Sequence, residues 1–327
     1  MLGFRGLALP DWLRAFAADH GLGGVILFDR DVQLGGLRNV ESPAQVRALC
    51  AELHALPSRP LVFVDQEGGK VRRLKPTSGF ADLPSARAFA VLPDAEARRF
   101  AAESCGEMKA LGIDFDLAPV VDLDTNPDNP NIGKIERAFS ADANEVRRCA
   151  RIFGDAARAV GLGLCVKHFP GLGGARTDSH LALTDLSGLV STEQERLFYE
   201  LAAELPGGAA LLSHGFVREW DAALPASISP VAVARFRAAQ RDVLLITDDV
   251  QMQGLQGAAG TVDAALRALD AGVDIVCIGN NLLAQADECI EAACEARARA
   301  TRDADFAGKL AASRARIAAR KEFARIA

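Results

Sequence analysis

The segment Lys167–His180 carries the side chains of this sequence that are best suited to acid/base chemistry. It combines a lysine, two histidines, an aspartate and three glycines, which is typical of a loop at a site and unusual for a core element. Asp178 and His180 stand two positions apart, so the carboxylate can orient the imidazole and raise its pKa. Such a pair can donate and accept a proton during a reaction.

Two other kinds of site could use the same segment. His168, Asp178 and His180 could together hold a metal ion. The glycines at 171, 173 and 174 could cradle a phosphate, but the GxxxxGK[ST] pattern is absent and Pro170 stands directly before them. Hinge flexibility is the better interpretation of these glycines. We therefore favour the acid/base pair and expect neither a metal nor a cofactor.

A further candidate, Asp248, follows the most apolar run of the chain, residues 243–247. A carboxylate in this position can be a covalent nucleophile, a metal ligand or the cap of the next helix. Its neighbour Asp249 is the better candidate for a purely structural role. We therefore interpret Asp248 as the residue available for chemistry and Asp249 as a structural residue.

Eight short apolar runs alternate with amphipathic stretches along the chain. Most of them are rich in Val, Ile and Leu with little alternation, which is typical of parallel strands covered on both faces. The runs are Leu2–Arg5, Gly24–Phe28, Leu61–Asp65, Asp114–Val121, Leu162–His168, Ala209–His214, Val243–Asp248 and Val273–Gly279. The stretches between them predict helices that begin at Ser42 and span Ala95–Leu111, Asn144–Val160, Ser191–Leu205, Ser229–Gln240, Thr261–Ala271 and Leu282–Ala300.

This alternation predicts an α/β fold, a (β/α)8 TIM-type barrel. We expect a single catalytic domain over residues 1–327, with an outer C-terminal helix at about Asp305–Ile326. The alternative is an open doubly wound sheet, which would carry a GxGxxG turn after an early strand. Gly68 and Gly69 follow the third run but do not form that pattern.

In a barrel of this kind the functional site lies at the C-terminal ends of the strands. Ionisable or polar side chains follow many of the expected strands, although any single one could serve as a helix cap or a structural hydrogen-bonding group. They are Asp65, Glu67, Arg73, Asp122, Asp124, Lys167, His168, Ser213, His214, Asp248 and Asp249. Their concentration at one end of the barrel predicts a site there.

The composition of the sequence indicates the cellular compartment and the kinds of partner that we expect for the protein. The seven cysteines include no CxxC pair, which indicates free thiols in a reducing compartment and argues against disulfides or zinc. The net charge of −6 comes from interspersed acidic and basic residues, which argues against a nucleic-acid partner. The sequence shows neither a signal peptide nor a membrane-spanning run, so we expect no membrane partner and a cytoplasmic location.

These motifs resemble those of the β-N-acetylhexosaminidases of glycoside hydrolase family 3, especially the bacterial NagZ-type enzymes, which consist of one barrel. The resemblance covers nearly the whole chain, and its motifs occur in the order found in that family. They lie in Gly23–Phe28, Val64–Val71, Ala118–Asp122, Glu136–Phe139, Lys167–Gly171, Asp178–His180 and Thr247–Asp249.

The resemblance implies a retaining exo-β-N-acetylglucosaminidase. Asp248 would be the nucleophile, and His180 would be the general acid/base, oriented by Asp178. The residues that would hold the terminal N-acetylglucosamine are Asp65, Arg73, Arg137, Lys167 and His168. The substrate would be a small carbohydrate, such as an N-acetylglucosaminide or a muropeptide in peptidoglycan recycling.

Two positions depart from the family pattern. Leu172 stands where many family members carry a second histidine, so a loop contact could be lost. The stretch before Arg137 is longer than the spacing usual in the family.

Three alternatives to this activity stay open. A β-glucosidase of the same family would usually carry further domains and a carboxylate acid/base outside the barrel. A β-N-acetylglucosaminide phosphorylase would use the same histidine, because imidazole tolerates an anionic phosphate nucleophile better than a carboxylate does. A sugar-binding barrel without turnover is disfavoured because Asp248 and His180 are both present.

Overall fold

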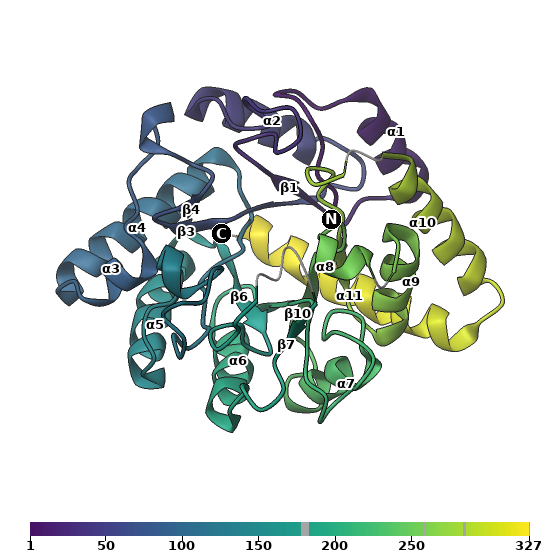
Figure 1. Ribbon diagram of the computed structural model, residues 1–327. Coiled ribbons are helices and arrows are strands. Elements are labelled where there is room, and N and C mark those ends of the chain that lie inside the picture. The colour runs from purple at the N-terminus through teal and green to yellow at the C-terminus, as the bar shows by residue number, and fades with distance from the viewer. Residues whose placement is uncertain (178–182, 258, 284–285, 327) are drawn as a thin grey trace.

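The computed structural model describes residues 1–177, 183–257, 259–283 and 286–326. Their main feature is a ring of parallel strands surrounded by helices (Figure 1). In order around the ring, the strands are β1 (Gly24–Leu27), β2 (Leu61–Val64), β5 (Phe115–Asp116), β6 (Gly163–Phe169), β8 (Ala209–Leu212), β10 (Leu244–Asp249) and β11 (Ile275–Cys277).

A single residue, Leu2, closes the ring between β11 and β1. Leu2 bridges Val25 in β1 and also Ile278, which directly follows β11. The backbone amide of Leu2 donates to Gly24 O at 3.0 Å, and the amide of Ile26 donates to Leu2 O at 3.1 Å. The predicted (β/α)8 barrel is thus confirmed, with its first expected strand reduced to one bridging residue.

The helices lie outside the ring and alternate with its strands. The longer ones are α1 (Asp11–His20), α2 (Pro43–His54), α4 (Asp94–Leu111), α5 (Ala143–Val160), α6 (Thr192–Glu204), α7 (Pro230–Ala239), α9 (Thr261–Ala271), α10 (Ala286–Ala300) and α11 (Ala304–Ile326). Short elements decorate the loops: β3 (Gln66–Gly68), β4 (Val71–Arg72), β7 (Thr184–Asp185), β9 (Gly215–Phe216), α3 (Ala86–Ala90), α8 (Gln253–Gln256) and two 3₁₀ turns, Pro76–Ser78 and Gly133–Ile135.

Serine caps begin three of these helices at the positions that the sequence predicts. The hydroxyl oxygens of Ser42, Ser191 and Ser229 each accept a hydrogen bond from a backbone amide three residues later, at 3.1–3.3 Å. Such a cap satisfies one of the amides that the first helical turn leaves without a partner. The starts of α2, α6 and α7 are therefore encoded locally.

The fourth strand is shorter than the expected run Asp114–Val121. β5 ends at Asp116, and Val120 forms only an isolated bridge to Lys167 in β6. Pro119 lies between them and has no amide hydrogen for a neighbouring strand, so the ladder is interrupted there.

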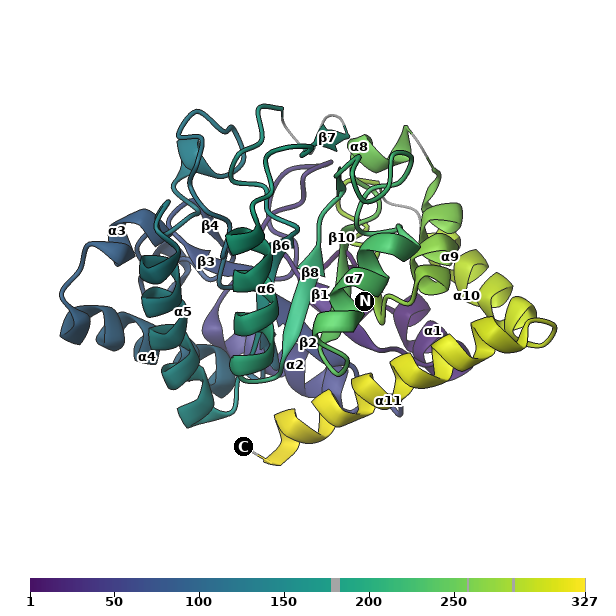
Figure 2. The ribbon, with the colours of Figure 1, turned by 90° about the horizontal axis from the view of Figure 1, so that it is seen from below.

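The C-terminal helix α11 covers the end of the barrel at which the strands begin (Figure 2). Its Ile317 and Ala324 pack against the apolar cluster inside the ring. Arg320 donates from Nε to Gly207 O, and Lys321 donates from Nζ to Ser58 O, each at 2.7 Å. Because this end is covered, the opposite end is the one that can form a site.

The structure can be compared with two expectations drawn from the sequence, namely that the cysteines are free thiols and that no segment spans a membrane. All seven cysteines are free thiols, and all but Cys294 are buried. Burial raises the pKa of the Cys50 thiol to about 12, so it packs as a neutral apolar group. Over the residues described, no helix combines the length and the apolar character needed to cross a membrane.

Candidate active site

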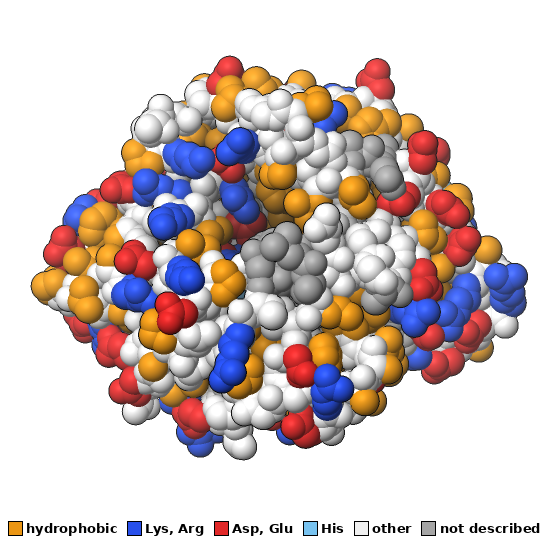
Figure 3. All heavy atoms as spheres, in the orientation of Figure 1, with side chains coloured by type: hydrophobic (Ala, Val, Ile, Leu, Met, Phe, Trp, Pro, Cys, Tyr) orange, Lys and Arg blue, Asp and Glu red, His pale blue; other side chains and the backbone are white. Residues whose placement is uncertain are grey.

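A cavity of about 480 Å³ opens at the C-terminal ends of the barrel strands. Figure 3 shows it as a hollow near the middle of the face seen in Figure 1, with Lys and Arg side chains gathered along one side. Six of the predicted site residues line this cavity: Asp65, Arg73, Arg137, Lys167, His168 and Asp248. The other two, Asp178 and His180, lie outside the described residues.

Asp65 follows β2 and binds two cations at the cavity wall. Its Oδ1 accepts from Lys167 Nζ at 2.7 Å, and its Oδ2 accepts from Arg73 NH2 at 3.0 Å. Burial alone would raise the pKa of Asp65, but the charges of Lys167 and Arg73 hold it well below its usual range. Asp65 is therefore an ionised acceptor near neutral pH.

The side chain of Gln66 holds the β3–β4 hairpin that carries Arg73. Gln66 Oε1 accepts from the backbone amides of Arg73 and Leu74, each at 3.0 Å, and Gln66 Nε2 donates to Leu74 O at 3.0 Å. These three bonds fix the backbone next to Arg73 and so direct its guanidinium toward Asp65.

Glu67 is a site residue to which the sequence analysis assigned no role. Its Oε2 accepts from Arg137 Nε at 2.7 Å, and its Oε1 accepts from Arg137 NH2 at 2.8 Å. Lys167 Nζ lies 2.5 Å from the same Oε1. Burial alone would raise the pKa of Glu67, but Arg137 and Lys167 lower it to about 2. The sequence signals for it were its place after the third expected strand and in the motif that also contains Asp65.

The structure accommodates the longer stretch before Arg137 as a compact turn. Gly133–Ile135 forms a 3₁₀ turn, and Glu136 ends it with a left-handed backbone at φ 60°. A β-carbon on Gly133 would lie 2.6 Å from the carbonyl oxygens of Asn126 and Pro127, so only glycine fits. The turn returns Arg137 to the cavity, where its NH1 donates to Asn131 O at 2.9 Å.

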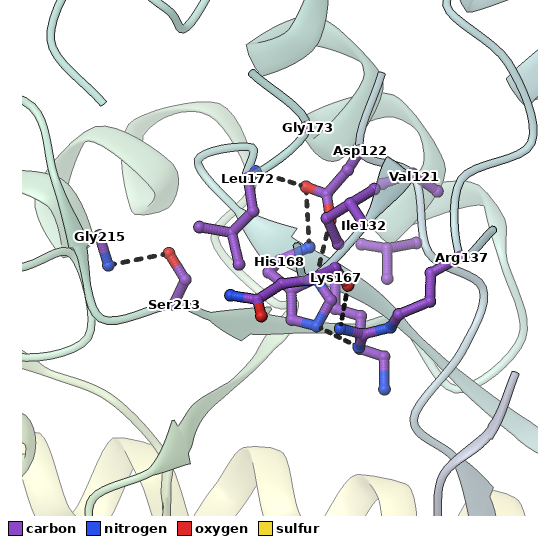
Figure 4. Close-up of polar contacts among 12 residues, drawn as sticks. Val121, Asp122, Ile132, Arg137, Lys167, His168, Leu172, Gly173, Ser213 and Gly215 are labelled. Carbon is purple, nitrogen blue, oxygen red and sulfur yellow. Dashed lines mark hydrogen bonds and ion pairs between the residues drawn. The ribbon is translucent and has the colours of Figure 1, made fainter. Parts of the chain in front are cut away.

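His168 lies between Asp122 and Arg137, as Figure 4 shows. His168 Nδ1 is 2.7 Å from Asp122 Oδ2, and His168 Nε2 is 2.9 Å from Arg137 NH2. Asp122 is fully buried, and its Oδ1 also accepts from the amide of Leu172 at 2.8 Å. The sequence placed Asp122 after a strand but gave it no role, because its partner lies 46 positions away.

Asp248 and Asp249 end β10 and have different surroundings. Both side chains line the cavity, and Asp248 Oδ1 accepts from the amide of Asp249 at 2.9 Å. The Asp249 carboxylate accepts from the amides of Gln251 and Gly279, at 3.0 and 3.1 Å. The carbonyl oxygen of Asp249 lies 2.8 Å from His214 Nε2. These bonds tie β10 to its neighbours and give Asp249 a structural function.

Two of the glycines expected to form a hinge are also required by close packing. A β-carbon on Gly173 would lie 1.7 Å from Leu123 O, and one on Gly171 would lie 2.6 Å from Gln194 Cγ. Gly171 also has φ +129°, which L side chains rarely adopt. Leu172 between them is buried against an apolar group that includes Val120. The start of this loop is therefore packed onto the barrel.

No three His, Cys, Asp or Glu side chains within the described ranges gather as a metal site would require. The cavity instead combines ionised carboxylates with Lys and Arg, a set of acceptors and donors suited to the hydroxyl groups of a sugar.

Comparison with known proteins agrees with this architecture. The sequence profile of the glycosyl hydrolase family 3 N-terminal domain matches residues 8–304. A β-hexosaminidase of Thiobacillus denitrificans is 35% identical over 293 residues, which are 86% of this chain and 78% of that protein. A β-hexosaminidase of Pseudomonas aeruginosa is 35% identical over 266 residues, 77% of each protein.

Solved structures have the same fold. The β-N-acetylhexosaminidase of Beutenbergia cavernae superposes with a TM-score of 0.85 at 29% identity, over 98% of this chain and 96% of that one. NagZ of Neisseria gonorrhoeae in complex with N-trifluoroacetyl-D-glucosamine superposes with a TM-score of 0.73 at 25% identity, over 99% and 96%. The extent of the family match and the identity to these relatives show that the protein belongs to glycosyl hydrolase family 3 and is a glycoside hydrolase.

Proposed function

We propose that the protein is a retaining exo-β-N-acetylglucosaminidase that releases terminal β-linked N-acetylglucosamine from peptidoglycan fragments. The observation that carries this proposal is one cavity that holds Asp248 together with a paired set of sugar-binding donors and acceptors. The names of the relatives support the choice of sugar, because they are β-hexosaminidases and one was solved with an N-acylated glucosamine.

Asp248 is the best candidate for the nucleophile among the carboxylates at the cavity. Asp65 is bound to Lys167 and Arg73, which weakens it as a nucleophile. Glu67 is likewise held in ion pairs, and Asp249 accepts from two backbone amides. Asp248 is the penultimate residue of β10 and lines the cavity at the C-terminal end of that strand, where catalytic residues of such barrels are found.

The proposed reaction has two steps. In the first, Asp248 attacks the anomeric carbon while His180 protonates the leaving oxygen, which gives a glycosyl ester on Asp248 and a free aglycone. In the second, His180 takes a proton from water, and the water displaces Asp248 with net retention of configuration. Asp178 would orient His180. The roles of His180 and Asp178 are proposed from the sequence.

A blind-ended cavity favours removal of terminal sugars. Its floor consists of side chains from inside the ring, among them Ile26, Leu117 and Leu211. Helix α11 covers the barrel beyond them. A sugar chain therefore cannot pass through the barrel below the site, which supports binding of a residue at the end of a chain.

The sugar would be held by charge-assisted hydrogen bonds. Asp65 would accept from sugar hydroxyl groups, whereas Arg73, Arg137 and Lys167 would donate to them. His168 would be the fifth residue that holds the sugar. As part of the same proposal, the substrates are muropeptides and other N-acetylglucosaminides in the cytoplasm, and residues 1–327 act as one catalytic domain without nucleic-acid or membrane partners.

The test is hydrolysis of an aryl β-N-acetylglucosaminide by the wild type and by Asp248→Ala. We expect the wild type to cleave it with retention and the variant to lose at least about a hundredfold in rate. A fluorinated sugar that slows the second step should leave its mass on the peptide that contains Asp248. Cleavage of the β-glucoside alone would overturn the sugar specificity, and full activity of Asp248→Ala would overturn the nucleophile. Formation of a sugar phosphate in phosphate buffer would replace hydrolysis by phosphorolysis.

A further inference from the structure

We propose that Asp122 is a positioning residue that fixes the proton of His168 on Nδ1 and thereby holds Arg137 in the cavity. Asp122 does not line the cavity, so it would act on the sugar only through His168 and Arg137. The consequence for sugar binding rests on the proposed function, whereas the position of the proton does not.

The three side chains form one chain of contacts across the cavity wall (Figure 4). Asp122 Oδ2 lies 2.7 Å from His168 Nδ1, and His168 Nε2 lies 2.9 Å from Arg137 NH2. Asp122 has no exposed surface and His168 is 4% exposed, so water does not compete for either contact. His168 and Arg137 both line the cavity, and Arg137 also binds Glu67.

The donors and acceptors determine where the proton of His168 lies. A guanidinium carries only donors, so His168 Nε2 must accept the hydrogen bond from Arg137. An imidazole that accepts at Nε2 carries its proton on Nδ1, and an ionised carboxylate accepts that proton. Asp122 therefore selects the tautomer that gives Arg137 an acceptor.

Backbone amides determine which oxygen of Asp122 faces the imidazole. Asp122 Oδ1 accepts from the amides of Leu172 and His168, at 2.8 and 3.3 Å, which leaves Oδ2 for His168 Nδ1. The carboxylate cannot rotate without losing these bonds. The same bonds fix the start of the loop that continues toward the predicted Asp178 and His180.

This arrangement makes Asp122→Asn an informative substitution. The amides of Leu172 and His168 need an acceptor, so the asparagine oxygen takes the place of Oδ1 and its NH2 group faces His168 Nδ1. Two donors cannot pair, so the proton of His168 moves to Nε2. Nε2–H then faces Arg137 NH2, again two donors, and the guanidinium must shift away. Asp122→Asn hardly changes the volume of the side chain. It therefore alters the cavity by moving the proton of His168.

Nitrogen NMR of selectively ¹⁵N-histidine-labelled protein tests the proton directly. The chain has five histidines, so the spectrum is simple, and His168→Gln identifies the signals of His168. We expect Nδ1–H in the wild type and Nε2–H in Asp122→Asn. Kinetics on an aryl β-N-acetylglucosaminide should show KM raised roughly tenfold with kcat changed little, because Arg137 would bind the sugar equally before and during reaction.

Asp114→Asn provides a matched control at the other end of the barrel. Asp114 Oδ2 accepts from the amide of Val62 and lies 2.8 Å from His54 Nε2, so it is also a buried carboxylate paired with a histidine. This variant should change the signals of His54 and leave KM unchanged.

Two results would overturn the proposal. One is Nε2–H on His168 in the wild type, which needs no variant and so stands even if Asp122→Asn fails to fold. The other is a folded Asp122→Asn that keeps Nδ1–H or keeps the wild-type KM. If the wild type shows Nδ1–H but cleaves no N-acetylglucosaminide, the proposed function fails while the assignment to Asp122 is retained.

Discussion

Arg137 and Glu67 form a bidentate ion pair inside the cavity, with Nε to Oε2 at 2.7 Å and NH2 to Oε1 at 2.8 Å. The two residues are 70 positions apart, and Lys167 from a third segment binds the same carboxylate. Glu67 is therefore the point at which three separate segments of the chain are joined at the site.

Glu67→Gln should damage both the fold and the site. The neutral amide removes the buried charge that balances Arg137 and Lys167, and breaking a buried pair in this way costs about 3–5 kcal/mol. We expect a lower midpoint in chemical unfolding and a raised KM for the aryl glycoside. Glu103→Gln, which breaks only the exposed pair with Arg99, should change neither. Equal effects of both substitutions would contradict this view of Glu67.

Because of Asp116, the free energy of unfolding should decrease as the pH rises from about 4 to about 7. Asp116 is fully buried, and burial raises its pKa from 3.8 to about 7. Between these values the native state holds a proton that the unfolded chain has released, so a higher pH favours the unfolded chain. Asp116 Oδ1 accepts from Gln66 N at 2.9 Å, whereas Oδ2 has no hydrogen-bond partner within the described residues.

The measurement is thermal unfolding of the wild type and Asp116→Asn at pH 4.5 and pH 8. The amide keeps an acceptor for Gln66 without burying a charge, so the variant should be the more stable at pH 8, by up to about 4 kcal/mol. The difference should shrink at pH 4.5. The surface variant Asp128→Asn should show no such dependence, and a difference independent of pH would contradict the prediction.

Gly173→Ala and Gly174→Ala separate close packing from hinge flexibility. The new β-carbon at 173 would overlap Leu123 O at 1.7 Å, whereas the one at 174 would lie no closer than 3.1 Å to any atom, with the Thr125 hydroxyl as its nearest neighbour. We expect Gly173→Ala to lose about 1–3 kcal/mol of stability and most activity, and Gly174→Ala to stay close to the wild type. A similar fall in kcat for both, with stability unchanged, would instead support a hinge.

The effect of removing the proposed acid/base side chain, His180, on the rate of cleavage should depend on the leaving group of the substrate. His180→Ala should slow cleavage of an alkyl or sugar glycoside by about 10²–10⁴-fold, because its leaving oxygen needs a proton. A dinitrophenyl glycoside, whose leaving group departs as an anion, should be affected much less in its first step. His20→Ala should behave as the wild type with both substrates. A uniform loss across leaving groups would argue against general acid catalysis by His180.

The barrel and much of its site could be predicted because both follow from local signals. Apolar runs identified the strands, and parallel strands bring their ends together, so Asp65, Lys167 and Asp248 meet although they are distant in the sequence. Glu67 and Asp122 could not be assigned roles in the same way. Each is one carboxylate in a motif, and its role depends on Arg137 or His168, whose positions are set by tertiary packing.

The close packing at the glycines and the shortened first strand could not be predicted, for a similar physical reason. Glycine is compatible with a hinge and with a close contact, and only the position of Leu123 decides between them at Gly173. The run Leu2–Arg5 has strand-like composition, but its pairing with both neighbours in the ring is centred on the single residue Leu2. Such outcomes depend on distances that no short stretch of sequence contains.

The floor of the cavity has a consequence for any attempt to alter this protein. Ile26, Leu117, Leu211 and Cys277 belong both to the packed interior of the ring and to the surface that would meet the sugar. Selection for a more heat-resistant barrel and selection for a different sugar would therefore act on the same atoms. A larger side chain that fills the interior would also shorten the space available to a substrate, so durability and substrate range cannot be adjusted independently at these four positions.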